Sequence, residues 1–238
     1  TSLKMDVTTA DTSLAAADAL KIEQRIEGQN LQYLKKGTSS AESTTISFWV
    51  KSAKTGIYIS ELFDNDNSRQ ISQSYTISNA NTWEKKTLTY AGDTSGAFGN
   101  DNESSLSLNL WLGAGSNYSS GTLSTTWTSS TNANRAVGQV NLSDSTSNDW
   151  YVTGIQLEAG TSASEFEFLP VDVNLQRCLR YCYVITGATD QAIAIGDNAN
   201  GSGAALFFLP LLTEMRSAPS GTFTTASHFE KLKYETGW

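Results

Sequence analysis

Two long polar segments of this chain carry side chains of the types that recognise sugars. They lie in Gly92–Glu103 and Gly113–Asn134, and they are Phe98, Asp101, Asn117, Tyr118 and Trp127. Aromatic faces stack on the apolar faces of pyranose rings, while amide and carboxylate groups form hydrogen bonds with sugar hydroxyls. We therefore predict these five residues as a ligand-binding set, since loops often carry function. The alternative is that the aromatic rings fold back onto a sheet or fill a subunit interface.

Catalytic motifs are missing from the sequence. The single histidine, His228, lies in a Ser/Thr-rich segment near the end of the chain, and no nucleophile elbow accompanies it. No glycine loop fits phosphate binding, and neither HExxH nor CxxC occurs. The 24 acidic residues could supply a carboxylate pair only if two of them lie at a suitable separation in space. We predict no catalytic residues and no enzymatic activity.

Two short patterns could bind a metal ion. The turn Asp64–Ser68 (DNDNS) has oxygen ligands at alternate positions, as a calcium-binding loop does. Arg69 stands where such a loop has its glycine, so a solvated hairpin turn is favoured. Cys178 and Cys182 lie four residues apart on a predicted helix, where a role as small apolar residues is favoured over a metal pair or a disulfide. We predict no cofactor.

Alternating apolar residues predict the elements that hold the two polar segments. Ile46, Phe48 and Val50 share one face of a strand over Thr44–Ser52, and a second strand is expected from leucines at alternate positions: Leu106, Leu108, Leu110 and Leu112. We expect these leucines to bury against that face. Further strands are expected within or over Lys21–Leu34, Gly56–Phe63, Tyr75–Ile77, Trp83–Tyr90 and Ala136–Leu142. Trp49 and Trp83 are expected to pack between sheets.

About eight to ten short strands separated by turn clusters indicate an antiparallel sandwich or barrel. The count does not distinguish a jelly roll from an immunoglobulin-like sandwich.

The stretch Tyr151–Tyr183 predicts a strand, a turn, a second short strand and a helix. The first strand covers Tyr151–Leu157, and Phe166 and Phe168 place two large side chains on one face of the second. Pro170 ends that strand, and Asn174 is expected to cap a helix. The helix has an apolar stripe with a spacing of four residues: Leu175, Leu179 and Tyr183. We expect oligomerisation through this stripe, with packing on the chain's own sandwich as the alternative.

Three ordered blocks of this sequence resemble a segment of tail fibre and related virion proteins of tailed bacteriophages. They are Ile46–Lys51 (ISFWVK) with Thr55-Gly56, Asn81–Thr89 (NTWEKKTLT) with Gly92–Gly96, and Thr153–Glu158 (TGIQLE) with Phe166-Glu167 and Cys178–Cys182 (CLRYC). This chain departs from the family pattern at Leu179, where a glutamine is usual, and at Cys182, where the second tyrosine is usual. The resemblance implies an all-β fold, with an antiparallel jelly-roll β-sandwich like that of carbohydrate-binding modules. It also allows a structural calcium ion, whose ligands it does not assign.

The strands and the resemblance together predict four parts. Residues 1–20 form an N-terminal connecting segment, 21–170 the jelly-roll domain, 171–183 a connecting helix, and 184–238 a second small, incomplete β domain. The last part contains apolar stretches around a Gly/Asn-rich turn and an MR-x-x-P element that is similar to one in the family: Ile193–Ile195, Leu206–Leu211 and Met215–Pro219. Further strands are expected at Thr222–Thr225 and Phe229–Tyr234.

Charge and composition exclude several kinds of partner. The net charge of −8 argues against nucleic acid and anionic membranes, because both need clustered Lys and Arg. No apolar run approaches the ~20 residues of a membrane helix, and no secretory signal is present. The chain opens at Thr1 and stops at Trp238, so we expect a piece of a longer polypeptide.

Three functional hypotheses follow. The first is a non-enzymatic structural and adhesive component of a phage tail, which would sit in the virion. The resemblance implies that its partners are further copies of itself in a trimer, other tail proteins and a host-surface glycan. The second is a carbohydrate-binding module of a secreted glycan-degrading enzyme. A purely structural virion scaffold without a ligand is an alternative form of the first. A depolymerase is the third hypothesis, and the missing catalytic motifs count against it.

Overall fold

The protein is described by a computed structural model, which covers residues 1–184, 195–199, 204–208 and 211–218. The chain divides into two compact units, Thr1–Glu167 and Phe168–Trp238. His228 and the strands expected at 222–225 and 229–234 lie outside the described residues.

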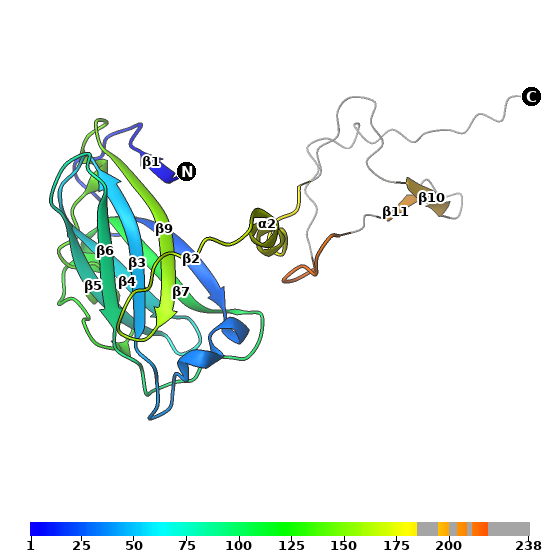
Figure 1. The fold of residues 1–238 in the computed structure, drawn as a ribbon. Coiled ribbons are helices and arrows are strands. Elements are labelled where there is room, and N and C mark those ends of the chain that lie inside the picture. The colour runs from blue at the N-terminus through cyan, green and yellow to red at the C-terminus, as the bar shows by residue number, and fades with distance from the viewer. Residues whose placement is uncertain (185–194, 200–203, 209–210, 219–238) are drawn as a thin grey trace, which may run out of the picture. The chain divides into compact units, whose positions relative to one another are not determined.

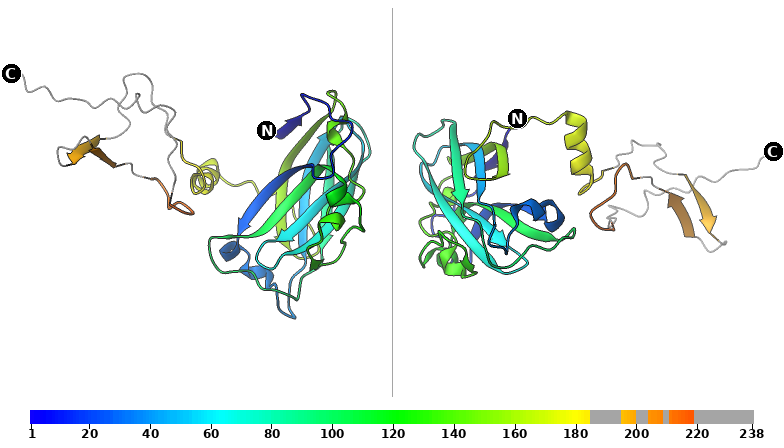
Figure 2. Two further views of the ribbon diagram at one scale, coloured as in Figure 1. Left: turned by 180° about the vertical axis from the view of Figure 1, so that it is seen from behind. Right: turned by 60° about the horizontal axis from the view of Figure 1, so that its bottom comes forward.

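The first unit is an antiparallel β-sandwich of two sheets (Figure 1), and Figure 2 shows it from two further sides. Sheet A contains, in spatial order, β1 (Leu3–Asp6), β9 (Asp149–Ala159), β3 (Thr44–Ser52) and β6 (Glu84–Tyr90). Sheet B contains β2 (Ala19–Glu27), β7 (Ser104–Ala114), β4 (Gly56–Asp64), β5 (Arg69–Ile77) and β8 (Thr128–Ser129). The chain passes repeatedly from one sheet to the other, as in a jelly roll. The predicted all-β sandwich is therefore confirmed.

The core lies between the sheets and follows from the alternation along β3 and β7. Ile46, Phe48 and Val50 of β3 are fully buried, and they share one apolar cluster with the buried alternate leucines of β7, Leu106, Leu108, Leu110 and Leu112. The predicted burial of these leucines is confirmed. Burial of each such side chain stabilises the fold by about 1.5–3 kcal/mol.

Two expected strands are wrong. Ala136–Leu142 forms turns that lead into a short 3-10 helix, Leu142–Asp144, because Ala136 is buried with Trp111 and Ile59 outside sheet B. The segment 161–167 is extended without forming a strand. The structure contains two strands that no sequence pattern predicts. One is β1, which lies in the expected connecting segment 1–20 and pairs with β9, and the other is β8, which pairs with β5.

The outer faces of the two sheets differ. The segment 115–140, which contains α1 (Ser116–Ser119) and a 3-10 helix at Asn132–Asn134, packs against the outer face of sheet B. Arg135 anchors it there, since its guanidinium donates two hydrogen bonds to the buried carboxylate of Glu61, at 2.7 and 3.0 Å. Among the described residues of the first unit, no comparable segment covers the outer face of sheet A. Large side chains on its outer face are therefore left in solvent.

The second unit contains α2 (Val171–Leu179) and a two-stranded antiparallel sheet of β10 (Ile195–Ala199) and β11 (Ala204–Phe208). The expected helix is present, but Asn174 is not its cap. The helix begins at Val171, directly after the extended residue Pro170, so Asn174 lies inside its first turns. Arg180 follows the helix. Its guanidinium donates to the Glu214 carbonyl, and its own carbonyl accepts from the Arg216 amide.

Candidate functional site

The loop aromatics Phe98 and Trp127 converge on one lysine. The Lys36 ammonium lies 5.0 Å from the ring centroid of Phe98 and 5.3 Å from that of Trp127. The Trp127 indole N–H also donates to the Ala91 carbonyl, at 2.8 Å. The three side chains line a pocket of about 20 Å³. A pocket of that volume holds about one water molecule and no sugar ring.

The Lys36 ammonium is held in a cage of oxygen atoms. It lies 2.5 Å from the Asp64 carboxylate and 3.1 Å from that of Asp93. It also donates to two backbone carbonyls, those of Ser95 at 3.0 Å and Gly96 at 2.7 Å. A buried cation needs such partners to offset its desolvation. The DNDNS turn thus serves a structural role, with Asp64 buried at its start.

Arg69 completes the charge balance of this cage. Its guanidinium donates two hydrogen bonds to Asp93, at 2.6 and 2.9 Å, so two cations face two carboxylates. Burial by itself would raise the pKa of Asp93. Hydrogen bonds from Arg69, then from the Ser95 amide and Lys36, outweigh burial and lower that pKa from its ordinary value of 3.8.

The structure places the other three predicted residues apart from this pair. Tyr118 packs its ring against Trp111 at 5.4 Å, within the segment that covers sheet B. Its neighbour Asn117 is exposed and donates its backbone N–H to Ala16. Asp101 is also exposed, and its carboxylate accepts from the Glu103 amide at 3.0 Å. The five residues therefore do not form one site.

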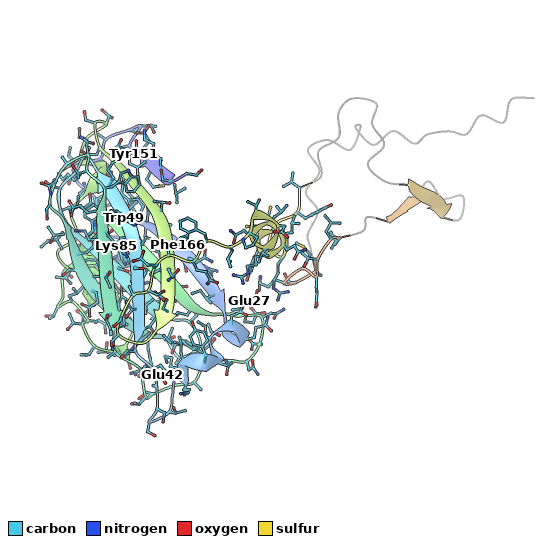
Figure 3. The ribbon with its side chains drawn as sticks, in the orientation of Figure 1. Glu27, Glu42, Trp49, Lys85, Tyr151 and Phe166 are labelled. Carbon is cyan, nitrogen blue, oxygen red and sulfur yellow. The ribbon has the colours of Figure 1, made fainter. Side chains whose placement is uncertain are left out.

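A second group of aromatic side chains lies on the outer face of sheet A. Trp49 of β3 is 44% exposed and Trp83, just before β6, is 37% exposed, so their expected packing between the sheets is wrong. Trp49 points outward because Phe48 and Val50, on either side of it in β3, take the inward positions. Figure 3 shows Trp49, Lys85, Tyr151 and Phe166 over the strands of sheet A.

Lys51 lies among the aromatic rings at one end of this face. Its ammonium is 4.2 Å from the ring centroid of Tyr151 and 5.5 Å from that of Trp83. The Trp83 and Tyr151 rings meet edge to face, with their centroids 6.3 Å apart. Lys51 lies opposite Tyr151 in the register of β3 with β9, and Trp49 lies opposite Lys85 in the register of β3 with β6. We call Trp49, Lys51, Trp83, Lys85 and Tyr151 the platform.

The chain after β9 folds back along the other end of the face, and we call residues 161–167 the strap. Gln156 donates to the Ser164 hydroxyl at 2.9 Å and accepts from the Glu167 amide at 2.8 Å. Glu158 accepts from the Ser164 amide and hydroxyl, at 3.1 and 2.5 Å. These bonds explain why the block Thr153–Glu158 (TGIQLE) and the later pair Phe166-Glu167 occur together in the sequence, because Gln156 and Glu158 hold the segment that contains the pair.

Gly154 lies where the strap meets the platform. Its φ of +59° lies in the left-handed region, which favours glycine. A Cβ atom at this position would lie 3.6 Å from the Trp49 ring and 3.7 Å from the Phe166 ring. Trp49 and Phe166 thus flank the glycine, and both rings remain partly exposed beside the platform.

A signal for the platform is present in the sequence. Trp49 shares its face of β3 with Ser47 and Lys51, so it belongs to the polar side of a strand whose apolar side fills the core. A tryptophan on the polar side of a half-buried strand is exposed unless another element covers it.

Among the described residues, no group of three or more His, Cys, Asp or Glu side chains could hold a metal ion. No helix in the described part of the chain is long and apolar enough to cross a membrane.

Comparison with known proteins gives a weak structural similarity. No protein-family model matches this chain, and no curated protein matches it. A solved structure entitled "CBM4 structure and function" superposes with a TM-score of 0.36 and 11% sequence identity, over 66% of this chain and 69% of that one.

Proposed function

We propose that this chain is a non-enzymatic glycan-binding protein, and that sugars bind to the platform of sheet A. The observation that supports this is the exposure of Trp49 and Trp83 on a sheet face that no described segment of the first unit covers, with the half-buried Tyr151 beside them. Exposed indole and phenol rings stack on pyranose rings, and the neighbouring polar strand residues bond their hydroxyls. An open face of this kind suits a sugar chain that extends beyond one ring.

The affinity of one such site is expected to be low. A stacked ring with two or three hydrogen bonds gives a dissociation constant of roughly millimolar to micromolar, because association entropy offsets much of the gain. Several copies on one particle would convert this into firm adhesion through effective concentration. Weak single sites are therefore compatible with an adhesive role.

We further propose that the glycan belongs to a host surface and that the chain is part of a phage tail. This placement rests on the sequence resemblance, as do a trimeric assembly and contacts with other tail proteins. The alternatives are a carbohydrate-binding module of a secreted glycan-degrading enzyme and a scaffold without a ligand. Binding to a glycan array would separate the scaffold from the other two.

Matched tryptophan variants test where the sugar binds. We expect Trp49→Ala to weaken binding to the glycans that the wild-type chain captures by about tenfold or more, which is about 1.4 kcal/mol, with an unchanged melting temperature. Trp127→Ala should lower the melting temperature, because Trp127 covers Lys36 and bonds Ala91. Once folded, it should retain binding.

The opposite result would show that the sugar binds to the polar loops predicted from the sequence, Gly92–Glu103 and Gly113–Asn134. In that case folded Trp127→Ala loses binding while Trp49→Ala keeps it. If the wild-type chain binds no glycan on an array that includes capsular and cell-wall polysaccharides, the proposal is wrong and the scaffold remains.

A further inference from the structure

We propose that the glycan bound by the platform is anionic, and that Lys51 and Lys85 recognise its carboxylate or phosphate groups. The inference rests on the proposed function and adds the chemical class of the ligand. It runs against the overall charge of the chain, which is −8, so it depends on the local balance of charge at the platform.

Three carboxylates of the strands on this face have partners within the protein, while Glu165 and Glu167 lie on the strap. Asp6 pairs with Lys4 at 3.0 Å, and Glu158 accepts both hydrogen bonds from Ser164. One carboxylate oxygen of Asp149 accepts a hydrogen bond from the Tyr151 hydroxyl at 2.9 Å, and the other oxygen is buried. Asp149 and Glu158 therefore present no accessible unengaged oxygen to a ligand, whereas the exposed Asp6 has one oxygen engaged, by Lys4.

The two lysines of the platform differ from these carboxylates. Within the described residues, neither Lys51 nor Lys85 has a carboxylate oxygen within 4.0 Å, the limit for an ion pair. Neither donates a hydrogen bond to a described protein group, whereas Lys36, Lys54 and Lys86 all do. Lys85 is near enough to Glu158 to contribute to the lowered pKa of that carboxyl, after the hydrogen bonds from Ser164 and Gln156. Lys51 is thus the platform cation that faces no carboxylate in contact, and Lys85 adds a second, partly compensated positive charge.

The position of Lys51 favours an ionic ligand. The rings of Tyr151 and Trp83 hold its ammonium beside the surface on which a sugar would stack. Contact with an aromatic face removes part of the ammonium's hydration and leaves its remaining N–H donors for the ligand. Lys85 is exposed and lies across the strand pair from Trp49. A sugar stacked on Trp49 would have an ammonium group on two sides.

Matched glycans test the inference on the whole chain. The probes are uronate-containing bacterial polysaccharides, the carboxyl-reduced form of each, a poly(ribitol phosphate) teichoic acid, and neutral glucans. We expect the wild-type chain to bind an acidic polymer at least about tenfold more tightly than its neutral counterpart, and to lose that preference as NaCl rises from about 0.05 to about 0.5 M.

Lysine variants test the residues. Lys51→Gln and Lys85→Gln should each weaken binding to the acidic polymer by about five- to tenfold, and should leave the melting temperature unchanged. Lys21→Gln is the matched control, because Lys21 also lies over an indole, Trp111 at 5.7 Å, but on sheet B and beside Glu23. It should bind like the wild type.

The outcomes separate the two proposals. Binding of uronate polymers alone, or of teichoic acid alone, supports the inference and identifies the anionic group. Equal binding of an acidic polymer and its carboxyl-reduced form, still abolished by Trp49→Ala, overturns the inference and keeps the proposed function. Binding of acidic polymers that Lys21→Gln weakens as much as Lys51→Gln does would assign the effect to overall charge and also overturn it. No binding of any polymer overturns both.

Discussion

At the scale of single residues, the two groups of aromatic side chains have opposite roles. Phe98 and Trp127 cover the caged ammonium of Lys36, while Trp49 and Trp83 lie in solvent on sheet A. The difference follows from what each ring contacts. An indole whose N–H is bonded to the backbone and whose face covers a buried cation contributes to folding.

The Lys36 cage makes stability dependent on pH through Asp93. We expect Asp93→Asn to lower the free energy of unfolding at pH 7 by about 3 kcal/mol, because two cations lose a carboxylate. The pKa of Asp93 is lowered in the folded state, so the unfolded chain takes up the proton first as the pH falls. The stabilisation is therefore full well above pH 3.8, the ordinary value, and is lost as the pH falls through and below it.

Urea unfolding at several pH values measures this effect. The difference between the wild type and Asp93→Asn should be constant at neutral pH and should shrink in acid. Asp101→Asn is the control, because Asp101 is exposed and its carboxylate accepts a hydrogen bond from the Glu103 amide, not from a cation. A difference that stays constant down to pH 2 would show that the carboxylate charge does not act through the cage.

At the scale of elements, the strap holds the end of the first unit against β9, the last strand of the sandwich. Most of its hydrogen bonds come from two side chains of β9, Gln156 and Glu158, and Thr89 of β6 donates one more to the Thr161 carbonyl. Segments of this kind, held by few bonds, open locally without global unfolding.

Removal of the glutamine should release the strap. We expect Gln156→Leu to raise the rate of proteolytic cleavage within residues 161–167 by about tenfold or more, because three hydrogen bonds to the strap, of roughly 0.5–1.5 kcal/mol each, are lost. The measurement is limited proteolysis with mass spectrometry. Gln24→Leu, at an exposed position on β2, is the control and should be cleaved like the wild type. Equal cleavage of all three proteins would mean that the strap is held by other contacts.

The strands show how far sequence patterns reach. β3 was predicted with its bounds, and β7 with its buried face, because alternation of side chains is a local property of the chain. The error at Ala136–Leu142 has a non-local cause, since that segment is shaped by the outer face of sheet B that it covers. The platform was missed for a related reason. Alternation places Trp49 on the face of β3 that points away from the core. Whether that face is exposed depends on segments distant in the sequence, which alternation does not reveal.

At the scale of the whole molecule, the second unit exposes apolar side chains on a short helix. α2 buries no residue, and Leu175 is 55% exposed on it. A helix of 9 residues is marginal in water unless its apolar face packs against something. The expectation of oligomerisation through this helix stays a prediction.

Leu175→Asp tests it directly. We expect the variant to sediment as a monomer where the wild-type chain forms a trimer, because three charged side chains would be buried together at the interface. Asn174→Asp is the control, since it adds the same charge to the same helix at an exposed polar position. An assembly of unchanged mass in Leu175→Asp would exclude the helix as the interface.

The strap also determines how tension would enter the sandwich. The chain passes into the second unit at Phe168, directly after the strap, so a pull on that unit is first borne by the bonds of Gln156 and Glu158. Those bonds lie beside Gly154, whose neighbours are Phe166 and Trp49. A particle tethered through the second unit and holding a glycan on the platform would therefore load one short stretch of β9 from both sides. The mechanical strength of the attachment would be set there, by a few hydrogen bonds and two rings, and not by the thermodynamic stability of the sandwich.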